Sequence, residues 1–103
     1  MSLKKQVLKS KPVCKVTFRF SKEMANDASS VALVGDFNNW DVNASPMSKL
    51  KTGDFTCVLE LTQGEFYEFR YLVNGTEWVN DPEADRQVAN NFGSENSVIE
   101  AYD

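Results

Sequence analysis

The segment at residues 65–82 reads EFYEFRYLVNGTEWVNDP, and its pattern decides the fold. Alternate positions from Tyr67 to Val73 are all aromatic or aliphatic. Successive side chains of a strand point to opposite faces of a sheet, so this parity predicts a strand with one buried aromatic face. The Asn74-Gly75 pair that follows is typical of a tight turn, and the segment is therefore predicted to be a β-hairpin.

The rest of the chain repeats the same period of two. Apolar and polar residues alternate over 14–20 and again over 55–61, and shorter strand-like runs cover 31–34 and 98–102. Residues that favour turns separate these runs, and no stretch of a dozen residues shows a helical stripe. The pattern predicts an all-β protein, an antiparallel β-sandwich of about seven strands.

The length and net charge of the chain indicate the number of domains and the kinds of partner to expect. The 103 residues are enough for one domain, which we place at 12–103, after a mobile N-terminal tail at 1–11. Eleven Lys and Arg stand against fifteen Asp and Glu, a net charge of −4. This balance opposes binding to nucleic acid or to an anionic membrane, so neither is expected as a partner.

Several kinds of chemistry are disfavoured by the residues available. The sequence has no His, the commonest general base and metal ligand, so we expect no metal, no cofactor and no catalytic residue. No apolar run has the length of a signal peptide or a membrane span, and we therefore expect a cytoplasmic protein. Cys14 and Cys57 each lie among alternating apolar residues, which predicts two buried, reduced thiols.

The loop at residues 35–41, GDFNNWD, places two aromatic residues among turn formers. Phe37 is expected to plug the open end of the sandwich. Trp40 has two open interpretations: it is a second plug, or it presents its ring face to a ligand.

Four motifs in order then resemble a known family. They are VALVGDFNNW at 31–40, GEFYEFRYLVNG at 64–75, EWVNDP at 77–82 and NFGSENSVI at 91–99. Together they resemble the isoamylase-type early-set modules, which include the glycogen-binding domain of AMP-activated kinase beta subunits and the N-terminal domains of glycogen branching and debranching enzymes. The resemblance covers about residues 13–102 and implies an immunoglobulin-like early-set sandwich.

The resemblance also implies a site for α-1,4-glucan. Trp40 and Trp78 match the residues that stack on glucose rings in the glycogen-binding members, and Asn96 matches an Asn that bonds sugar hydroxyls. Arg70 stands where those members usually have Lys, and Phe92 where they often have Leu. A sugar ring has an apolar face edged with hydroxyls, which aromatic rings with nearby polar donors complement.

Two functions follow as hypotheses. The first is noncatalytic binding of an α-glucan polymer or maltooligosaccharide, with a glycogen-metabolism enzyme or a kinase subunit as a protein partner. The alternative is a protein-docking module that keeps the fold and binds no sugar. Catalysis is not expected, because the acidic side chains are interpreted as solvated loop residues. These are Asp36, Asp41, Asp81, Glu83 and Asp85.

The register of the hairpin separates the two functions. A two-residue turn at Asn74-Gly75 would place Tyr71 opposite Trp78 and bury the indole. A three-residue loop would place Leu72 opposite Trp78, bringing the indole onto the face of Arg70. We predict the three-residue loop, because it pairs Tyr71 with the apolar Val79 and assembles Arg70 and Trp78 into one platform.

Overall fold

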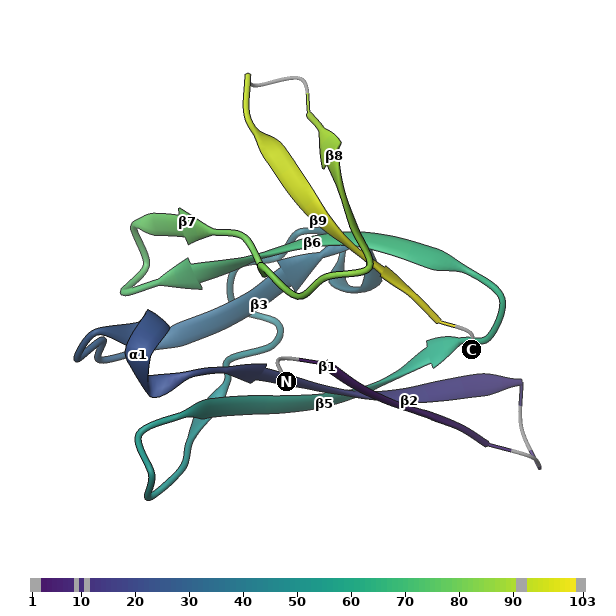
Figure 1. The fold of residues 1–103 in the computed structure, drawn as a ribbon, viewed down its shortest axis with the longest axis horizontal. Coiled ribbons are helices and arrows are strands. Elements are labelled where there is room, and N and C mark those ends of the chain that lie inside the picture. The colour runs from purple at the N-terminus through teal and green to yellow at the C-terminus, as the bar shows by residue number, and fades with distance from the viewer. Residues whose placement is uncertain (1–2, 9, 11, 91–92, 102–103) are drawn as a thin grey trace.

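The computed structural model describes residues 3–8, 10, 12–90 and 93–101. Their strands form two facing antiparallel sheets, so the predicted all-β sandwich is confirmed (Figure 1). The first sheet, in spatial order, contains β1 (Leu3–Val7), β2 (Val13–Phe20), β5 (Phe55–Thr62) and β4 (Ser48–Lys49). The second contains β3 (Val31–Gly35), β6 (Phe66–Val73), β9 (Glu95–Glu100) and β8 (Arg86–Ala89), with β7 (Glu77–Val79) also paired to β6.

The described residues thus form nine strands rather than about seven, and β1 lies where a mobile N-terminal tail was predicted. Residues 3–7 were predicted to be part of a mobile tail, but they form β1 and pair with β2 from Leu3↔Phe18 to Val7↔Cys14. The segment has too few apolar residues to predict a strand by itself, and it is held in place by tertiary contacts. Leu3 is buried, and Lys5 forms an ion pair with Asp85 at 2.7 Å.

Helices are short. Helix α1 (Lys22–Ala25) is one turn capped by Ser21, and the 3₁₀ turn η1 (Asp36–Asn38) follows β3 directly. Among the described residues, no helix has the length and apolar character that crossing a membrane requires.

Strand β6 is the centre of the second sheet. Strand β3 pairs along one side of it, from Val31↔Val73 to Gly35↔Phe69. Its other side is shared, since β9 pairs with the first half of β6 and β7 with the second half. Elements from three distant parts of the sequence therefore meet on β6.

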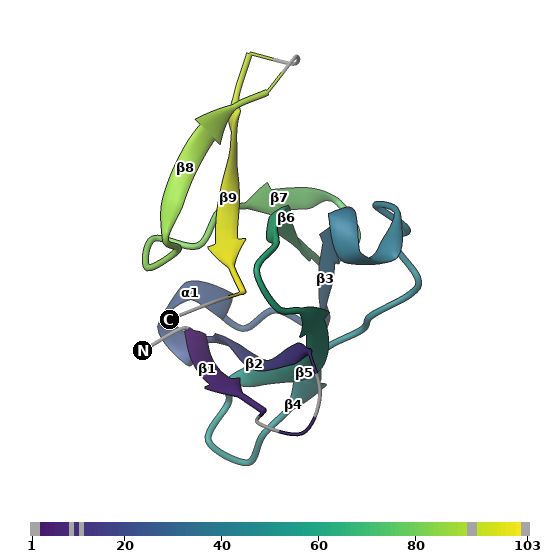
Figure 2. The same ribbon diagram turned by 90° about the vertical axis from the view of Figure 1, so that its right-hand side faces the viewer.

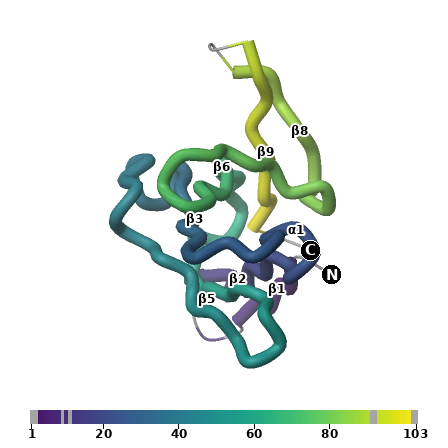
Figure 3. Tube along the Cα trace, turned by 90° about the vertical axis from the view of Figure 1, so that its left-hand side faces the viewer, coloured from purple at the N-terminus to yellow at the C-terminus, as the bar shows by residue number. Residues whose placement is uncertain are grey.

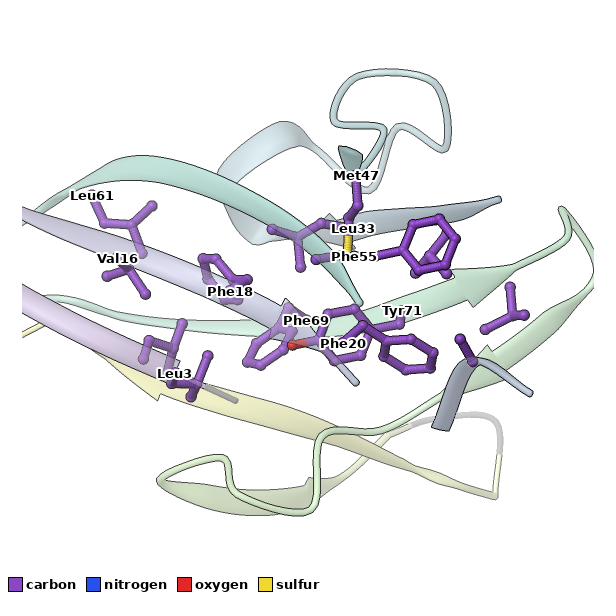
Figure 4. Close-up of a cluster of buried hydrophobic side chains, with 14 of the residues drawn as sticks. Leu3, Val16, Phe18, Phe20, Leu33, Met47, Phe55, Leu61, Phe69 and Tyr71 are labelled. Atoms are coloured by element: carbon purple, nitrogen blue, oxygen red, sulfur yellow. The ribbon is translucent and has the colours of Figure 1, made fainter. Parts of the chain in front are cut away.

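Aromatic rings fill the space between the sheets (Figure 4). The Phe69 ring lies 5.2 Å from that of Phe18 and 5.7 Å from that of Tyr71, both edge-on, and Phe20 packs 4.8 Å from Tyr71. All four side chains are fully buried. This is the face that the alternating pattern of β2 and β6 predicted.

The two cysteines differ in their surroundings. Cys14 is fully buried, as predicted, but Cys57 is half-buried, and burial raises the pKa of its thiol. Cys14 pairs with Leu61 and Cys57 with Phe18, four residues further along β2. Four strand residues span roughly 13 Å, beyond the Cα separation of a disulfide.

One part of the fold stands out from the two layers. Strands β8 and β9 form a hairpin whose far end projects away from the body of the sandwich (Figure 2; Figure 3). The base of β9 is tied to β6, so this projecting arm forms a wall beside the outer face of the second sheet.

Candidate functional site

The β6–β7 hairpin has the predicted three-residue register. Val73 pairs with Glu77, Leu72 with Trp78, and Tyr71 with Val79. Asn74 and Gly75 both have positive φ, 54° and 73°, which is the conformation that the loop needs at these positions. Opposed residues share a face, so Trp78 lies on the outer face of the sheet together with Arg70.

Arg70 and Trp78 are in direct contact there. The guanidinium carbon lies 5.6 Å from the centre of the indole, within the range of a cation–π interaction. Trp78 remains 40% exposed. The Nε of Arg70 is buried and has no hydrogen-bond partner among the described residues, whereas the side chain as a whole is half-buried and reaches the surface.

The loop after β3 is fixed by its backbone. Gly35 passes so close to β6 that a Cβ placed on it would lie 2.5 Å from the carbonyl oxygen of Glu68, which explains the glycine. The Asn38 side chain then holds the turn, accepting from the N–H of Gly35 at 3.1 Å and donating to the Leu33 carbonyl at 2.9 Å.

The two aromatic residues of this loop have different positions. Phe37 packs against the core, its ring 5.7 Å from that of Phe18 and 6.1 Å from that of Tyr67, and so it plugs the end of the sandwich as predicted. Trp40 is half-buried and lies on the outer side, where its indole Nε1 donates to Asp36 at 2.8 Å. Trp40 therefore borders a surface hollow rather than the core.

That hollow has a volume of about 640 Å³ and lies between β6, β7, the loop after β3 and the β8–β9 arm. Four of the five predicted site residues line it: Trp40, Arg70, Trp78 and Asn96. The fifth, Phe92, is outside the described residues. The hollow combines two indoles and one guanidinium with carboxylate and amide groups, a surface rich in both donors and acceptors.

Asn96 is held at both ends of its amide. Its Nδ2 donates to Glu68 Oε1 at 3.0 Å, and its Oδ1 accepts from Asn90 Nδ2 at 3.2 Å. Asn90 also closes the end of the β8–β9 hairpin, where its backbone N–H donates to the Ser94 carbonyl at 3.0 Å. The arm and β6 are thereby joined across the floor of the hollow.

The sequence interpretation missed four residues that line the hollow, the polar residues Asp36, Glu68 and Asn90 and the small residue Ala89. Glu68 shares the strand parity of Arg70, so its position on the outer face could have been read from the alternation. Asp36 was interpreted as a solvated loop acid, yet its carboxylate accepts from both Trp40 and the N–H of Glu68. No sequence signal connects these groups, which come from separate segments.

Asp81 was also expected to be a solvated loop acid, and this was wrong. It is fully buried and accepts from the Tyr71 hydroxyl at 2.8 Å, while its own N–H donates to Ser97 Oγ at 2.8 Å. Burial, and then the Asp81 carboxylate, raise the pKa of Tyr71 well above its ordinary value. Asp81 thus anchors the chain that leaves β7 and helps to fix Trp78 in place.

No group of three or more His, Cys, Asp or Glu side chains suited to a metal ion occurs in the described part of the chain. The carboxylates of the hollow are instead engaged with protein donors, Asp36 with Trp40 and Glu68 with Asn96.

A β-sandwich that carries two indoles, a guanidinium and amide groups around an open hollow defines a class, that of the β-sandwich carbohydrate-binding modules. Comparison with known proteins gives the particular family. Residues 15–103 match the family described as the glycogen recognition site of AMP-activated protein kinase, and the chain belongs to that family.

Two relatives contain similar segments. The chain is 35% identical over 74 residues to protein PTST homolog 2, chloroplastic, of Arabidopsis thaliana, covering 72% of this chain and 13% of that protein. It is 43% identical over 49 residues to the 1,4-alpha-glucan-branching enzyme of Emericella nidulans, covering 48% of this chain and 7% of the enzyme. The chain therefore corresponds to a small part of each relative.

Proposed function

We propose that this chain binds α-1,4-glucan without catalysis, using the hollow on the outer face of the second sheet. The observation that carries the proposal is the grouping of Trp40, Arg70 and Trp78 around one hollow. A sugar requires both indoles on a single surface, whereas a protein-docking module has no such requirement. The family to which the chain belongs is named for glycogen recognition, and this supports the same ligand class.

The chemistry of the hollow suits a neutral ligand rich in hydroxyls. An exposed indole offers an apolar surface to the C–H face of a glucose ring. The Arg70 guanidinium supplies N–H donors at the hollow, and Glu68 and Asn96 supply carboxylate and amide groups beside it. A guanidinium and two carboxylates share the hollow, so groups of both signs are present in it.

Weak binding is expected. If each indole removes on the order of 100 Å² of apolar surface from water, the gross gain is ~2.5 kcal/mol per ring. After the entropy lost on association, this supports dissociation constants in roughly the micromolar to millimolar range. Such affinity is useful on a polymer or within a tethered assembly, so we propose that the chain localises a partner, such as a glycogen-metabolism enzyme or a kinase subunit, on a glucan.

Intrinsic fluorescence provides a direct test. The sequence has two Trp residues and both border the hollow, so the emission reports on this surface alone. Titration with maltoheptaose should change the emission saturably. Cellohexaose has the same sugar with β-1,4 linkages and serves as the control, since its extended chain orients successive glucose rings differently from the α-1,4 chain.

The Trp78→Ala variant completes the test. It should retain the fold, because the indole is an exposed side chain of the outer face, and it should lose most of the affinity for maltoheptaose. An emission that maltoheptaose leaves unchanged, or that cellohexaose changes equally, would contradict the proposal and favour the docking module.

A further inference from the structure

We propose that Asp36 is a positioning residue of the glucan surface, which fixes the indole of Trp40 relative to β6. This inference rests on the proposed function for its ligand, and on hydrogen bonds and backbone geometry for the positioning itself. Asp36 itself makes no stacking contact with the sugar. It acts through Trp40.

The contacts of Asp36 join the loop to the sheet. Its Oδ1 accepts from the indole Nε1 of Trp40 at 2.8 Å, and its Oδ2 accepts from the backbone N–H of Glu68 at 2.8 Å. Glu68 in turn accepts from Asn96 through Oε1, at 3.0 Å. One carboxylate therefore sets the indole in a fixed relation to the strand that carries Arg70.

The backbone of the loop shows why the indole needs such support. Asn39 and Trp40 are consecutive residues with positive φ, 59° and 58°. A bulky side chain rarely adopts this conformation, which persists only where surrounding contacts enforce it. The enforcing contacts are the Trp40 N–H to Gly35 carbonyl bond at 2.9 Å and the bond from the indole to Asp36.

A carboxylate suits this position better than an amide does. Two donors, the indole N–H and the Glu68 N–H, converge on the side chain at position 36. A carboxylate offers an acceptor oxygen to each of them, whereas an Asn offers one oxygen and turns an NH₂ group toward the second donor. The substitution Asp36→Asn changes almost no volume and still removes one of the two bonds.

The test compares Asp36→Asn with Asp41→Asn. Asp41 is an exposed acid of the same loop that accepts from the Asn43 N–H at 2.9 Å, so its variant has the same charge change outside the hollow. The readouts are the ¹H–¹⁵N resonance of each indole and the affinity for maltoheptaose. Asp36→Asn should shift the Trp40 indole resonance, leave that of Trp78 in place and weaken binding roughly 5- to 30-fold.

Asp41→Asn should leave both indole resonances and the affinity unchanged. An Asp36→Asn variant with an unshifted Trp40 resonance and wild-type affinity would overturn the inference. If the Trp40 resonance shifts but even the wild-type chain binds no glucan, the proposed function fails and the positioning contact stands, so the two failures are distinguishable.

A measurement on the unmodified chain covers the case in which Asp36→Asn does not fold. The Trp40 indole N–H donates to Asp36, while no partner for the Trp78 indole N–H occurs among the described residues. Hydrogen exchange of the Trp40 indole should therefore be slower than that of the Trp78 indole. Equal or faster exchange at Trp40 would overturn the inference without any substitution.

Discussion

The two faces of strand β6 use neighbouring residues for different purposes. On the inner face, Phe69 and Tyr71 are fully buried, and the one polar group they carry, the Tyr71 hydroxyl, donates to Asp81. On the outer face, Arg70 contacts Trp78 and has a buried Nε with no described partner. The polar group of the inner face has its partner within the chain, whereas the outer face presents the exposed Trp78 ring and the Arg70 side chain to a surface hollow.

This difference shows how one strand can serve both the fold and a ligand. Odd-numbered residues of β6 face the core and even-numbered residues face outward, because adjacent side chains of a strand point in opposite directions. Substitutions on the inner face should therefore change the free energy of unfolding, and those in the outer hollow should change affinity.

The largest effect is expected at Phe69. The Phe69→Ala variant removes a ring that contacts Phe18 and Tyr71 and leaves a cavity between the sheets, which should lower the free energy of unfolding by about 3–5 kcal/mol. Denaturation in urea, followed by circular dichroism, measures this change. A loss below ~1 kcal/mol would show that the inner face is not the stabilising core.

Tyr71→Phe tests the polar part of the inner face. The variant keeps the ring and removes the hydroxyl that donates to the buried Asp81 carboxylate, a hydrogen bond to a charged group. The free energy of unfolding should fall by about 1.5–3 kcal/mol, with glucan affinity almost unchanged in the folded protein.

The same pair of proteins should respond differently to alkaline pH. The pKa of Tyr71 is raised in the folded state, so the folded chain holds this proton after an unfolded chain, with a Tyr pKa of about 10, has released it. The stability due to Tyr71 is present below pH ~10 and declines above it. The stability difference between wild type and Tyr71→Phe should therefore shrink as the pH rises beyond ~10, and a difference that grows instead would contradict the assignment.

Arg70→Ala should give the opposite result to Phe69→Ala at the next residue. It removes the guanidinium from the hollow, and affinity for maltoheptaose should weaken by about 1.5–3 kcal/mol in calorimetry. The free energy of unfolding should change by less than about 0.5 kcal/mol. The variant loses the contact with Trp78, but it also removes the buried Nε, whose lack of a described partner is unfavourable in the folded state. Unchanged affinity would remove Arg70 from the site.

The smallest effect is expected at Phe66, which lies on the outer face but does not line the hollow. Its ring is exposed, with the Arg86 guanidinium carbon 5.0 Å from its centre. Phe66→Ala should cost about 0.5–1 kcal/mol of stability and leave glucan affinity unchanged. A marked loss of affinity would mean that the binding surface extends along β6 beyond the hollow.

The sequence predicted those features that are encoded in local periodicity and turn chemistry. The alternation of apolar and polar residues identified β2, β5 and β6 and their buried faces. The three-residue loop predicted for the β6–β7 hairpin gave the register that places Trp78 beside Arg70. These features depend on residues close together in the sequence, so a short window contains the necessary information.

The features that were missed depend on contacts between distant segments. Strand β1 has little apolar character of its own and forms by pairing with β2. Asp81 and Asp36 are acids in loop-like sequence, yet each becomes an acceptor for a donor from another element, Tyr71 for one and Glu68 for the other. Acidic residues in a loop are predicted from sequence to be exposed to solvent, and only the tertiary structure shows which donors they accept from.

If the outer hollow binds α-glucan while the inner face serves the fold, a ¹H–¹⁵N correlation titration of the wild-type chain with maltoheptaose should show this directly. We expect saturable shifts of the Trp40 and Trp78 indole N–H groups and of the Asn96 side-chain amide, with the amides of β2 and β5 unmoved. Shifts confined to β2 and β5, or no shifts at millimolar sugar, would contradict it.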